Sequence, residues 1–436
     1  MRKQHIINLL FISSFSFFGI GRYLSQVSNF SIGYFFSIIP LLAIVLFYLL
    51  ELLYRRKPLP RLQTHYVWLV LLVIAFCWSF MTALRYDLPG LNSVNTTTLI
   101  LYVIVSAHTA LIVQLYNDPQ DEKGSLANLV YWGLTLLVLL NLLGYAAGLQ
   151  NAVHAIGGRI SLPFAQGLYS IACSVAILNL LILGRILKGK PRGFVLILYI
   201  AQFSLNLILM AGFNSRLSML TFVLVAGLLL TKLWRPYPIV YAVSLFTLPL
   251  LLGFSELIYE VVQLPVFSEI MQRVDYEDVT SFNGRRYLWE SSIDWLLTQG
   301  EGWWWGNGYK GYYTVDLFPE LNVSWGWGKE KIDIHQHSSM MSSLVANGVL
   351  GTLPLLVILW LCLKHYTHQY RHRLPNASLL GAMLYLLIIL EIDNYVYVES
   401  MGLYLLLVLS ADVMVNRRTP TVSQAAPPAE AYILQK

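Results

Sequence analysis

Charged residues are scarce in this chain. Asp, Glu, Lys and Arg make up 12% of its 436 residues, whereas about 25% is usual in a soluble domain. Hydrophobic residues make up 57%, and apolar stretches long enough to cross a bilayer, about 20 residues each, recur along the chain. This composition excludes an ordinary soluble domain and predicts an all-α polytopic membrane protein. The net charge of +6 then reflects loop topology, and we expect no nucleic-acid partner.

Cysteine and internal repeats are lacking as well. The three cysteines, Cys77, Cys173 and Cys362, all lie inside apolar stretches, where a buried and inert thiol is usual. No pair suggests a disulfide, and no Cys-x-x-Cys spacing suggests a metal. Paired repeats, which are common in membrane transporters, are not visible.

Hydropathy predicts about twelve transmembrane helices. The predicted spans lie near residues 6–22, 30–50, 66–84, 95–116, 126–148, 164–185, 193–211, 215–231, 237–255, 339–363, 377–394 and 397–415. The basic and apolar start of the chain also resembles a signal peptide, but it has no Ala-x-Ala-like cleavage site and a second span follows at once. An uncleaved first helix is therefore expected.

Lys and Arg concentrate in alternate connections, and this alternation places both termini in the cytoplasm. The short outer connections carry only single arginines. One connection, 256–338, is long, acidic and assigned to the outside. We therefore expect four regions, with the following boundaries: spans 1–9 in 1–255, a large periplasmic loop with interfacial helices in 256–338, spans 10–12 in 339–416, and a disordered cytoplasmic tail in 417–436.

Two isolated arginines lie at the predicted outer face. Arg159, in HAIGGRISLPFAQG, precedes the sixth span, and Arg216, in AGFNSRLSML, lies between two spans that turn with almost no loop. Asn214 or Ser215 could cap the helix after Arg216, which would place a helix N-terminus beside a guanidinium. That arrangement suits a phosphate. A snorkelling interfacial arginine is the alternative at each position.

The long loop contains a second arginine pair and most of the tryptophans. Arg285 and Arg286 open a helix, RRYLWESSIDWLLTQ, whose apolar face suits the membrane surface, and a helix N-terminus is an anion site. Trp289 belongs to a cluster with Trp295, Trp303, Trp304, Trp305, Trp325 and Trp327. Such rings stack on sugars or form an interfacial belt. A solvated basic pair is the alternative for the arginines.

A histidine pair ends this loop. Asp333, His335 and His337 follow one another at every second position, but no further ligand group accompanies them, so we expect neither a metal nor a cofactor. A histidine that faces several arginines is expected to have a lowered pKa and to stay neutral. His337 is then a candidate general base or acceptor-positioning group, and His335 could share this role.

Four motifs in this order resemble the superfamily of O-antigen ligases and Wzy-type O-antigen polymerases. They are GGRISLPFAQG around Arg159, NSRLSML around Arg216, GRRYLW with a following Gly-x-Gly, and His337-Ser338-x9-Gly348, which fits the ligase-type pattern H-[NSQ]-x9-G. The predicted topology of twelve spans with one late periplasmic loop is also similar. The sequence departs from the family at Gln166, where asparagine is common, and in its paired histidines.

The resemblance implies a GT-C-like membrane fold and metal-independent, inverting glycosyl transfer at the periplasmic face of the bacterial inner membrane. The donor would be a glycan on undecaprenyl diphosphate, and the acceptor would be lipid A-core or another lipid-linked glycan. The implied catalytic residues are His337, Arg216 and Arg285. The implied substrate-binding residues are Arg159, Arg286, His335 and Trp289.

The histidine motif favours a ligase of lipopolysaccharide biosynthesis over a polymerase of O-antigen or exopolysaccharide. A transporter or flippase for a lipid-linked sugar is the alternative from another class. Transporters usually bind their cargo near the bilayer midplane between paired repeats, whereas these arginines lie toward the outer face.

Overall fold

The computed structural model describes residues 3–55, 62–86, 88, 91–117, 121–149, 160–165, 167–263, 276, 280, 282, 285–318, 336–397 and 400–415. Over these residues the chain is an all-α polytopic membrane protein, as predicted, with one isolated bridge between Leu62 and Val415. Its helices are α1 Lys3–Val27, α2 Phe30–Arg55, α3 Tyr66–Ala83, η1 Leu84–Tyr86, α4 Ser93–Tyr116, α5 Leu126–Ala146, α6 Gly167–Gly189, α7 Phe194–Phe213, α8 Arg216–Thr231, α9 Tyr237–Leu245, α10 Thr247–Gly253, α11 Ser255–Val262, α14 Arg285–Leu297, α15 Gly311–Thr314, α17 Ser339–Arg371, α18 Leu379–Ile392, η2 Asn394–Val396 and α19 Met401–Met414.

The helices match the predicted spans closely. Within the described residues, eight helices are long and apolar enough to cross a membrane, and α8, α18 and α19 are shorter apolar helices. The exception is 237–255, where one continuous helix was predicted and the chain instead forms α9 and α10 with a break at Phe246. Pro249 explains the break, because its ring clashes with the carbonyl of Leu245 and it has no N–H to donate.

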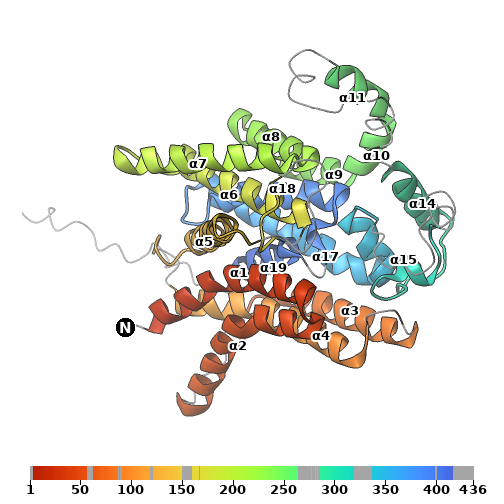
Figure 1. Ribbon diagram of the computed structural model, residues 1–436, viewed down its shortest axis with the longest axis horizontal. Helices are drawn as coiled ribbons and strands as arrows, with labels where there is room; N and C mark the ends of the chain where they lie inside the picture. The colour runs from red at the N-terminus through yellow and green to blue at the C-terminus, as the bar shows by residue number, and fades with distance from the viewer. Residues whose placement is uncertain are drawn as a thin grey trace, which may run out of the picture.

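The centre of the bundle is formed by α6, α17, α18 and α19. Every residue of α18 and of α19 is buried, as expected for helices that are apolar on all sides. In Figure 1, α7 and α8 run along one side of this centre and α1 to α4 along the other. The helices α10, α11, α14 and α15 gather at one end of the long axis, which we call the loop end.

Helix α17 reaches from the bundle into the loop end. Its 33 residues correspond to about 50 Å, more than the roughly 30 Å of hydrocarbon in a bilayer. The helix is interrupted at Gly348, whose φ of 68° and ψ of 179° are not helical. The N-terminal part before Gly348 therefore belongs with α14 and α15, and the remainder packs along α3 and α18.

Candidate active site

The connection between α18 and α19 is the centre of the candidate site. Asp393 follows the last residue of α18 in an extended conformation, and its side chain accepts a hydrogen bond of 2.7 Å from the backbone N–H of Asn394. The carbonyl of Asp393 accepts from both the N–H and the hydroxyl of Ser339, at 3.0 and 2.8 Å. Val396 donates its N–H to the same hydroxyl at 2.9 Å. The start of α17 is thereby fixed to residues 392–396.

His337 lies at this junction, two residues before α17 begins. Its φ of 46° is left-handed, and the side chain is half-buried. Ser338 caps the helix by accepting a bond of 3.2 Å from the N–H of Met341. The indole Nε1 of Trp289 donates to the carbonyl of His337 at 3.3 Å. These contacts hold the histidine at the N-terminus of a helix.

Arg285 approaches the same connection from α14. It is the first residue of that helix and is only 7% exposed. One of its terminal nitrogens, Nη1, donates to the carbonyl of Ile392 at 3.4 Å, and its charge acts on the carboxylate of Asp393. Trp289 stands one turn later on the same face of α14. One helix therefore holds the arginine and also the indole that positions His337.

Arg216 opens α8, and only Asn214 and Ser215 separate it from the end of α7, so the nearly loop-free turn was predicted correctly. Asn214 ends α7 in a left-handed conformation with a φ of 48°. The predicted side-chain cap is wrong: Ser215 occupies the N-cap position, but its buried hydroxyl makes no capping bond. The carbonyl of Ser215 instead accepts a hydrogen bond of 3.0 Å from the backbone N–H of Met219, so α8 starts without a side-chain cap.

The first turn of α8 packs toward the same centre as Arg285. The hydroxyl of Ser218 lies 2.8 Å from that of Tyr385 on α18, and Cys173 on α6 lies close to both. Cys173 also lies in the electrostatic field of Asp393 and Arg285. The turn that carries Arg216 and the buried Arg285 therefore adjoin one polar cluster.

The other candidate residues have different surroundings. Arg286 is exposed and pairs with Glu290 at 2.8 Å on the outer face of α14. Trp289 is 0% exposed and packs against Leu248, so direct stacking of its ring on a sugar stays a prediction. Arg159 and His335 lie outside the described residues, and so does Asp333. Among the described residues no three His, Cys, Asp or Glu side chains are close enough to hold a metal.

Helix α14 buries a face that differs from the one we expected on the membrane surface. Leu288, Trp289, Ser292 and Trp295 are buried, whereas Leu297 is 76% exposed. Leu288 and Trp295 belong to a cluster with residues of α15 and α17. The predicted apolar face of Trp289, Ile293, Leu296 and Leu297 is therefore only partly the buried one: Trp289 is buried, Ile293 and Leu296 are half-buried, and Leu297 is exposed. Packing against α15 and α17 selects the face with Leu288 and Trp295 instead.

A glycine-rich turn connects α14 to the interruption in α17. Gly306 and Gly308 both have positive φ, 80° and 86°. Asn307 and Gly308 donate their N–H groups to the carbonyls of Val345 and Ala346 at 2.9 and 3.0 Å.

The interruption at Gly348 completes this contact. Beyond it, the N–H groups of Val349 and Leu350 bond the carbonyls of Trp303 and Trp304 at 2.9 and 3.2 Å. The glycine of the histidine motif is therefore a packing position for the loop.

Three tryptophans form a shallow cleft beside this turn. Trp303, Trp304 and Trp305 line it together with Gln299, and its volume is about 260 Å³. Trp304 and Trp305 are 53% and 66% exposed, so they retain the open faces that stacking requires. Trp325 and Trp327 lie outside the described residues.

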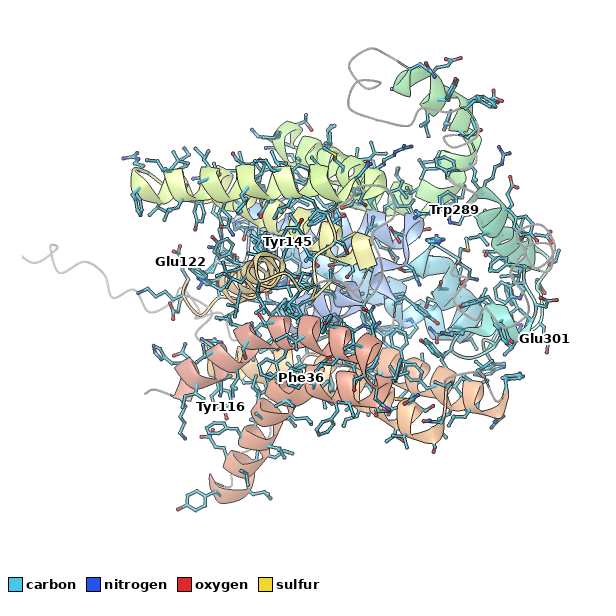
Figure 2. The ribbon with its side chains drawn as sticks, viewed as in Figure 1. Phe36, Tyr116, Glu122, Tyr145, Trp289 and Glu301 are labelled. Carbon is cyan, nitrogen blue, oxygen red and sulfur yellow. The ribbon has the colours of Figure 1, made fainter. Side chains whose placement is uncertain are left out.

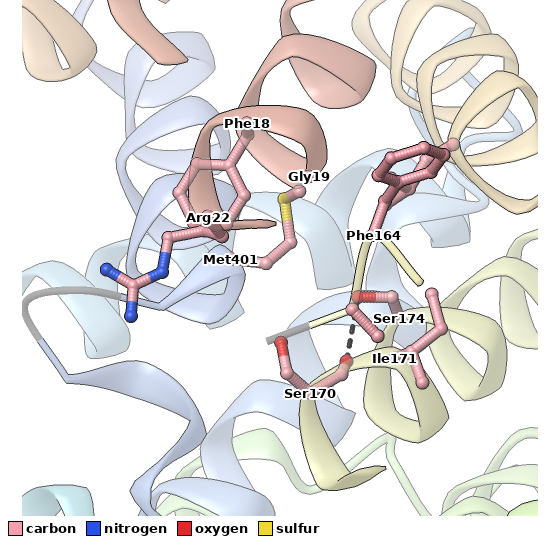
Figure 3. Close-up of a pocket in the computed structure, with 10 residues that line it drawn as sticks. Phe18, Gly19, Arg22, Phe164, Ser170, Ile171, Ser174 and Met401 are labelled. Carbon is pink, nitrogen blue, oxygen red and sulfur yellow. Dashed lines mark hydrogen bonds between the residues drawn. The ribbon is translucent and has the colours of Figure 1, made fainter. Parts of the chain in front are cut away.

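A small cavity adjoins the polar cluster on the side of α1 (Figure 3). Ser174 lines it and shares a hydrogen bond of 2.9 Å with the hydroxyl of Tyr395 in η2. Arg22 also lines it, is 8% exposed and lies with its guanidinium 4.7 Å from the ring centre of Tyr34. The volume of about 10 Å³ is comparable to the space that one water needs.

Sequence reasoning missed two groups beside His337. Asp393 was hidden in the predicted span 377–394, although an acid in an apolar stretch is itself a functional signal. Gln336 is 0% exposed, and neither atom of its side-chain amide has a hydrogen-bond partner within the described residues. No pattern in the sequence distinguishes this glutamine from a loop residue.

Comparison with known proteins supports the expected family. Residues 201–356 match the family model described as O-Antigen ligase. This interval contains Arg216, Arg285, His337 and Gly348. No curated protein matches the chain. The resemblance to the O-antigen ligase and polymerase superfamily is therefore confirmed for residues 201–356, which resemble an O-antigen ligase domain within a multi-pass membrane protein.

Proposed function

We propose that the protein transfers a glycan from undecaprenyl diphosphate to a sugar hydroxyl of lipid A-core, on the periplasmic face of the inner membrane. The observation that carries this proposal is the convergence of three helix starts, those of α8, α14 and α17, on one polar cluster. They carry Arg216, Arg285 and His337. The match to an O-antigen ligase model supports the same reaction class.

The two arginines suit the diphosphate of the donor. Arg216 and Arg285 each open a helix of more than ten residues, so the positive end of a helix dipole adds to each guanidinium charge. Negative charge grows on the phosphate oxygen as the bond to the sugar breaks. Fixed cations at that point stabilise the transition state more than the ground state. Arg159 and Arg286 would add contacts to the same anion or its glycan.

His337 suits the acceptor. The acceptor oxygen attacks the anomeric carbon, the bond from that carbon to the phosphate oxygen breaks, and undecaprenyl diphosphate leaves with the electron pair. The hydroxyl proton passes to the imidazole of His337. A single displacement inverts the anomeric centre and requires no metal. Trp289 acts as a positioning residue, because its indole holds the backbone of the histidine, and His335 shares the role if the acceptor reaches it.

The remaining parts of the proposal come from the predicted topology. The loop 256–338 closes over the glycan from the periplasm, with the tryptophan cleft as a stacking surface. Spans 1–9 and 10–12, in 1–255 and 339–416, hold the site at the lipid boundary, and both termini, including the tail 417–436, lie in the cytoplasm. Membrane lipids surround the bundle, and no cofactor takes part.

The test uses purified protein, a defined undecaprenyl-diphosphate glycan and purified lipid A-core, with and without a chelator. We expect glycan-bearing lipid A-core at equal rates in both conditions. Failure of transfer with an active donor and acceptor would contradict the proposal, and loss of transfer on chelation would contradict metal independence.

A lipopolysaccharide gel of a deletion strain separates ligase from polymerase. A ligase defect leaves core without O-antigen while lipid-linked polymer accumulates. Core that carries a single repeat would instead identify a polymerase.

A further inference from the structure

A cavity at the end of the bundle opposite the loop end gathers basic side chains. Its volume is about 360 Å³, and its walls come from α5, α6, α7 and the connection between α17 and α18. Figure 2 marks Glu122, which lines it, at the end of the molecule away from Trp289. Its charged lining residues are four cations and one carboxylate: Lys123, Arg185, Lys188, Arg373 and Glu122. We call this the basic cavity.

The cations of the basic cavity are not neutralised by carboxylates. Across the described part of the chain, none of the four forms an ion pair. Arg185 donates to neutral oxygens only, a backbone carbonyl, an amide and the hydroxyl of Tyr199, at 3.1 to 3.2 Å. Lys188 lies 3.7 Å from the ring centre of Tyr370 and in the field of Arg373. Gathering like charges is unfavourable unless an anion compensates them.

Three helix N-termini add to this positive potential. The cavity is lined by Ser125 and Ser378, the N-cap residues of α5 and α18, and by Val195 in the first turn of α7. These helices have 21, 14 and 20 residues. The positive ends of three dipoles therefore point toward the space that the basic side chains surround. A general excess of cytoplasmic Lys and Arg explains the number of cations, but not their arrangement around a cavity.

The surface beside the basic cavity is apolar. Phe194, Ile197 and Leu198 on α7 are 71%, 62% and 51% exposed, and only 17% of the most apolar part of α7 is buried. Val195, which is 50% exposed, belongs to both surfaces. A ligand that fills this site thus has an anionic head for the cavity and apolar chains for the side of α7.

We propose that the basic cavity binds the phosphodiester headgroup of an anionic phospholipid, with its acyl chains along α7. The phosphate accepts from Lys188 and Arg373, while Arg185 stays tied to the cavity wall and supplies charge. Basic pockets between helices at the cytoplasmic face are a known way to hold such lipids. This site is independent of the transfer reaction, because it lies at the other end of α6 and α18.

Lipid binding to the purified full-length protein tests the site. Phosphatidylglycerol, phosphatidylcholine or inorganic phosphate is added to detergent-solubilised protein, and bound lipid is counted by native mass spectrometry while the melting temperature is followed. We expect phosphatidylglycerol alone to be retained and to raise the melting temperature. Equal effects from phosphatidylcholine would overturn the proposal, and a saturable effect of inorganic phosphate would show a soluble anion in place of a lipid.

Variants locate the binding. Each charge lost near a headgroup weakens binding by about fivefold, the factor that about 1 kcal/mol represents. The double variant Lys188→Gln with Arg373→Gln should therefore weaken phosphatidylglycerol binding by more than about tenfold. Lys364→Gln, an exposed site at the same end of the bundle, should leave it unchanged.

Glu122→Gln removes the carboxylate of the lining, perturbs no other contact of the four cations and should strengthen binding about fivefold. Unchanged binding in both this variant and the double variant would overturn the assignment.

Discussion

Replacing Gly348 by alanine tests whether the glycine of the histidine motif is a packing requirement. With a φ of 68° and a ψ of 179°, its backbone lies in a region that is essentially open to glycine alone, where another residue costs about 1–3 kcal/mol. An added Cβ would stand 2.3 Å from the carbonyl oxygen of Trp304. Relief of that contact breaks the bonds from Val349 and Leu350 to the loop, each worth about 0.5–1.5 kcal/mol. The combined cost is about 2–6 kcal/mol.

The expected result is a protein that inserts into the membrane but melts several degrees lower and transfers glycan at least tenfold more slowly. Both effects are expected because the turn at 306–308 and the start of α17 lose the hydrogen bonds that hold them together. The matched control is Gly227→Ala in α8, where no atom lies within 4 Å of the added Cβ and helix propensity favours alanine. A Gly348→Ala protein with the melting temperature and transfer rate of the wild type would refute this reasoning.

Three further substitutions address the site itself. Arg285→Lys keeps the charge beside Asp393 but loses the planar fork of donors. We expect wild-type expression, a higher donor KM and a lower kcat, with kcat/KM reduced about tenfold in a steady-state assay. Trp289→Phe removes the indole donor to His337 and should lower kcat by about three- to tenfold with little change in acceptor KM; an unchanged kcat would exclude the positioning role. Gln336→Met removes a buried amide that makes no hydrogen bond among the described residues. The melting temperature should therefore stay the same or rise, while the acceptor KM should rise severalfold. An unchanged acceptor KM would exclude contact between Gln336 and the acceptor.

The membrane fold and the order of the site elements could be predicted from the sequence. Hydropathy identified the spans, because apolar length is a strong signal. Arg216 and Arg285 could be predicted as candidate site residues because each opens a helix after a polar turn. The positions at which these helices start, next to 216 and 285, were predicted within a residue.

The contacts between these elements could not be predicted. Asp393 was read as part of an apolar span, although its carbonyl and carboxylate organise the site. Trp289 was placed in a tryptophan cluster for which sugar stacking and an interfacial belt were both open, since composition cannot tell such a tryptophan from one that holds a neighbouring backbone. Both residues act through pairing between segments that lie about 50 to 100 residues apart, and local sequence carries no record of such pairing.

The most direct test of the account separates donor binding from transfer. Donor affinity and single-turnover rate are measured for purified His337→Ala and Arg216→Ala with a defined donor and acceptor. We expect His337→Ala to bind the donor within about threefold of wild type yet to transfer about 10²–10⁴-fold more slowly, because it loses a general base. Arg216→Ala should lose donor affinity as well as rate. Transfer at the wild-type rate by His337→Ala would contradict the role of His337 as the general base.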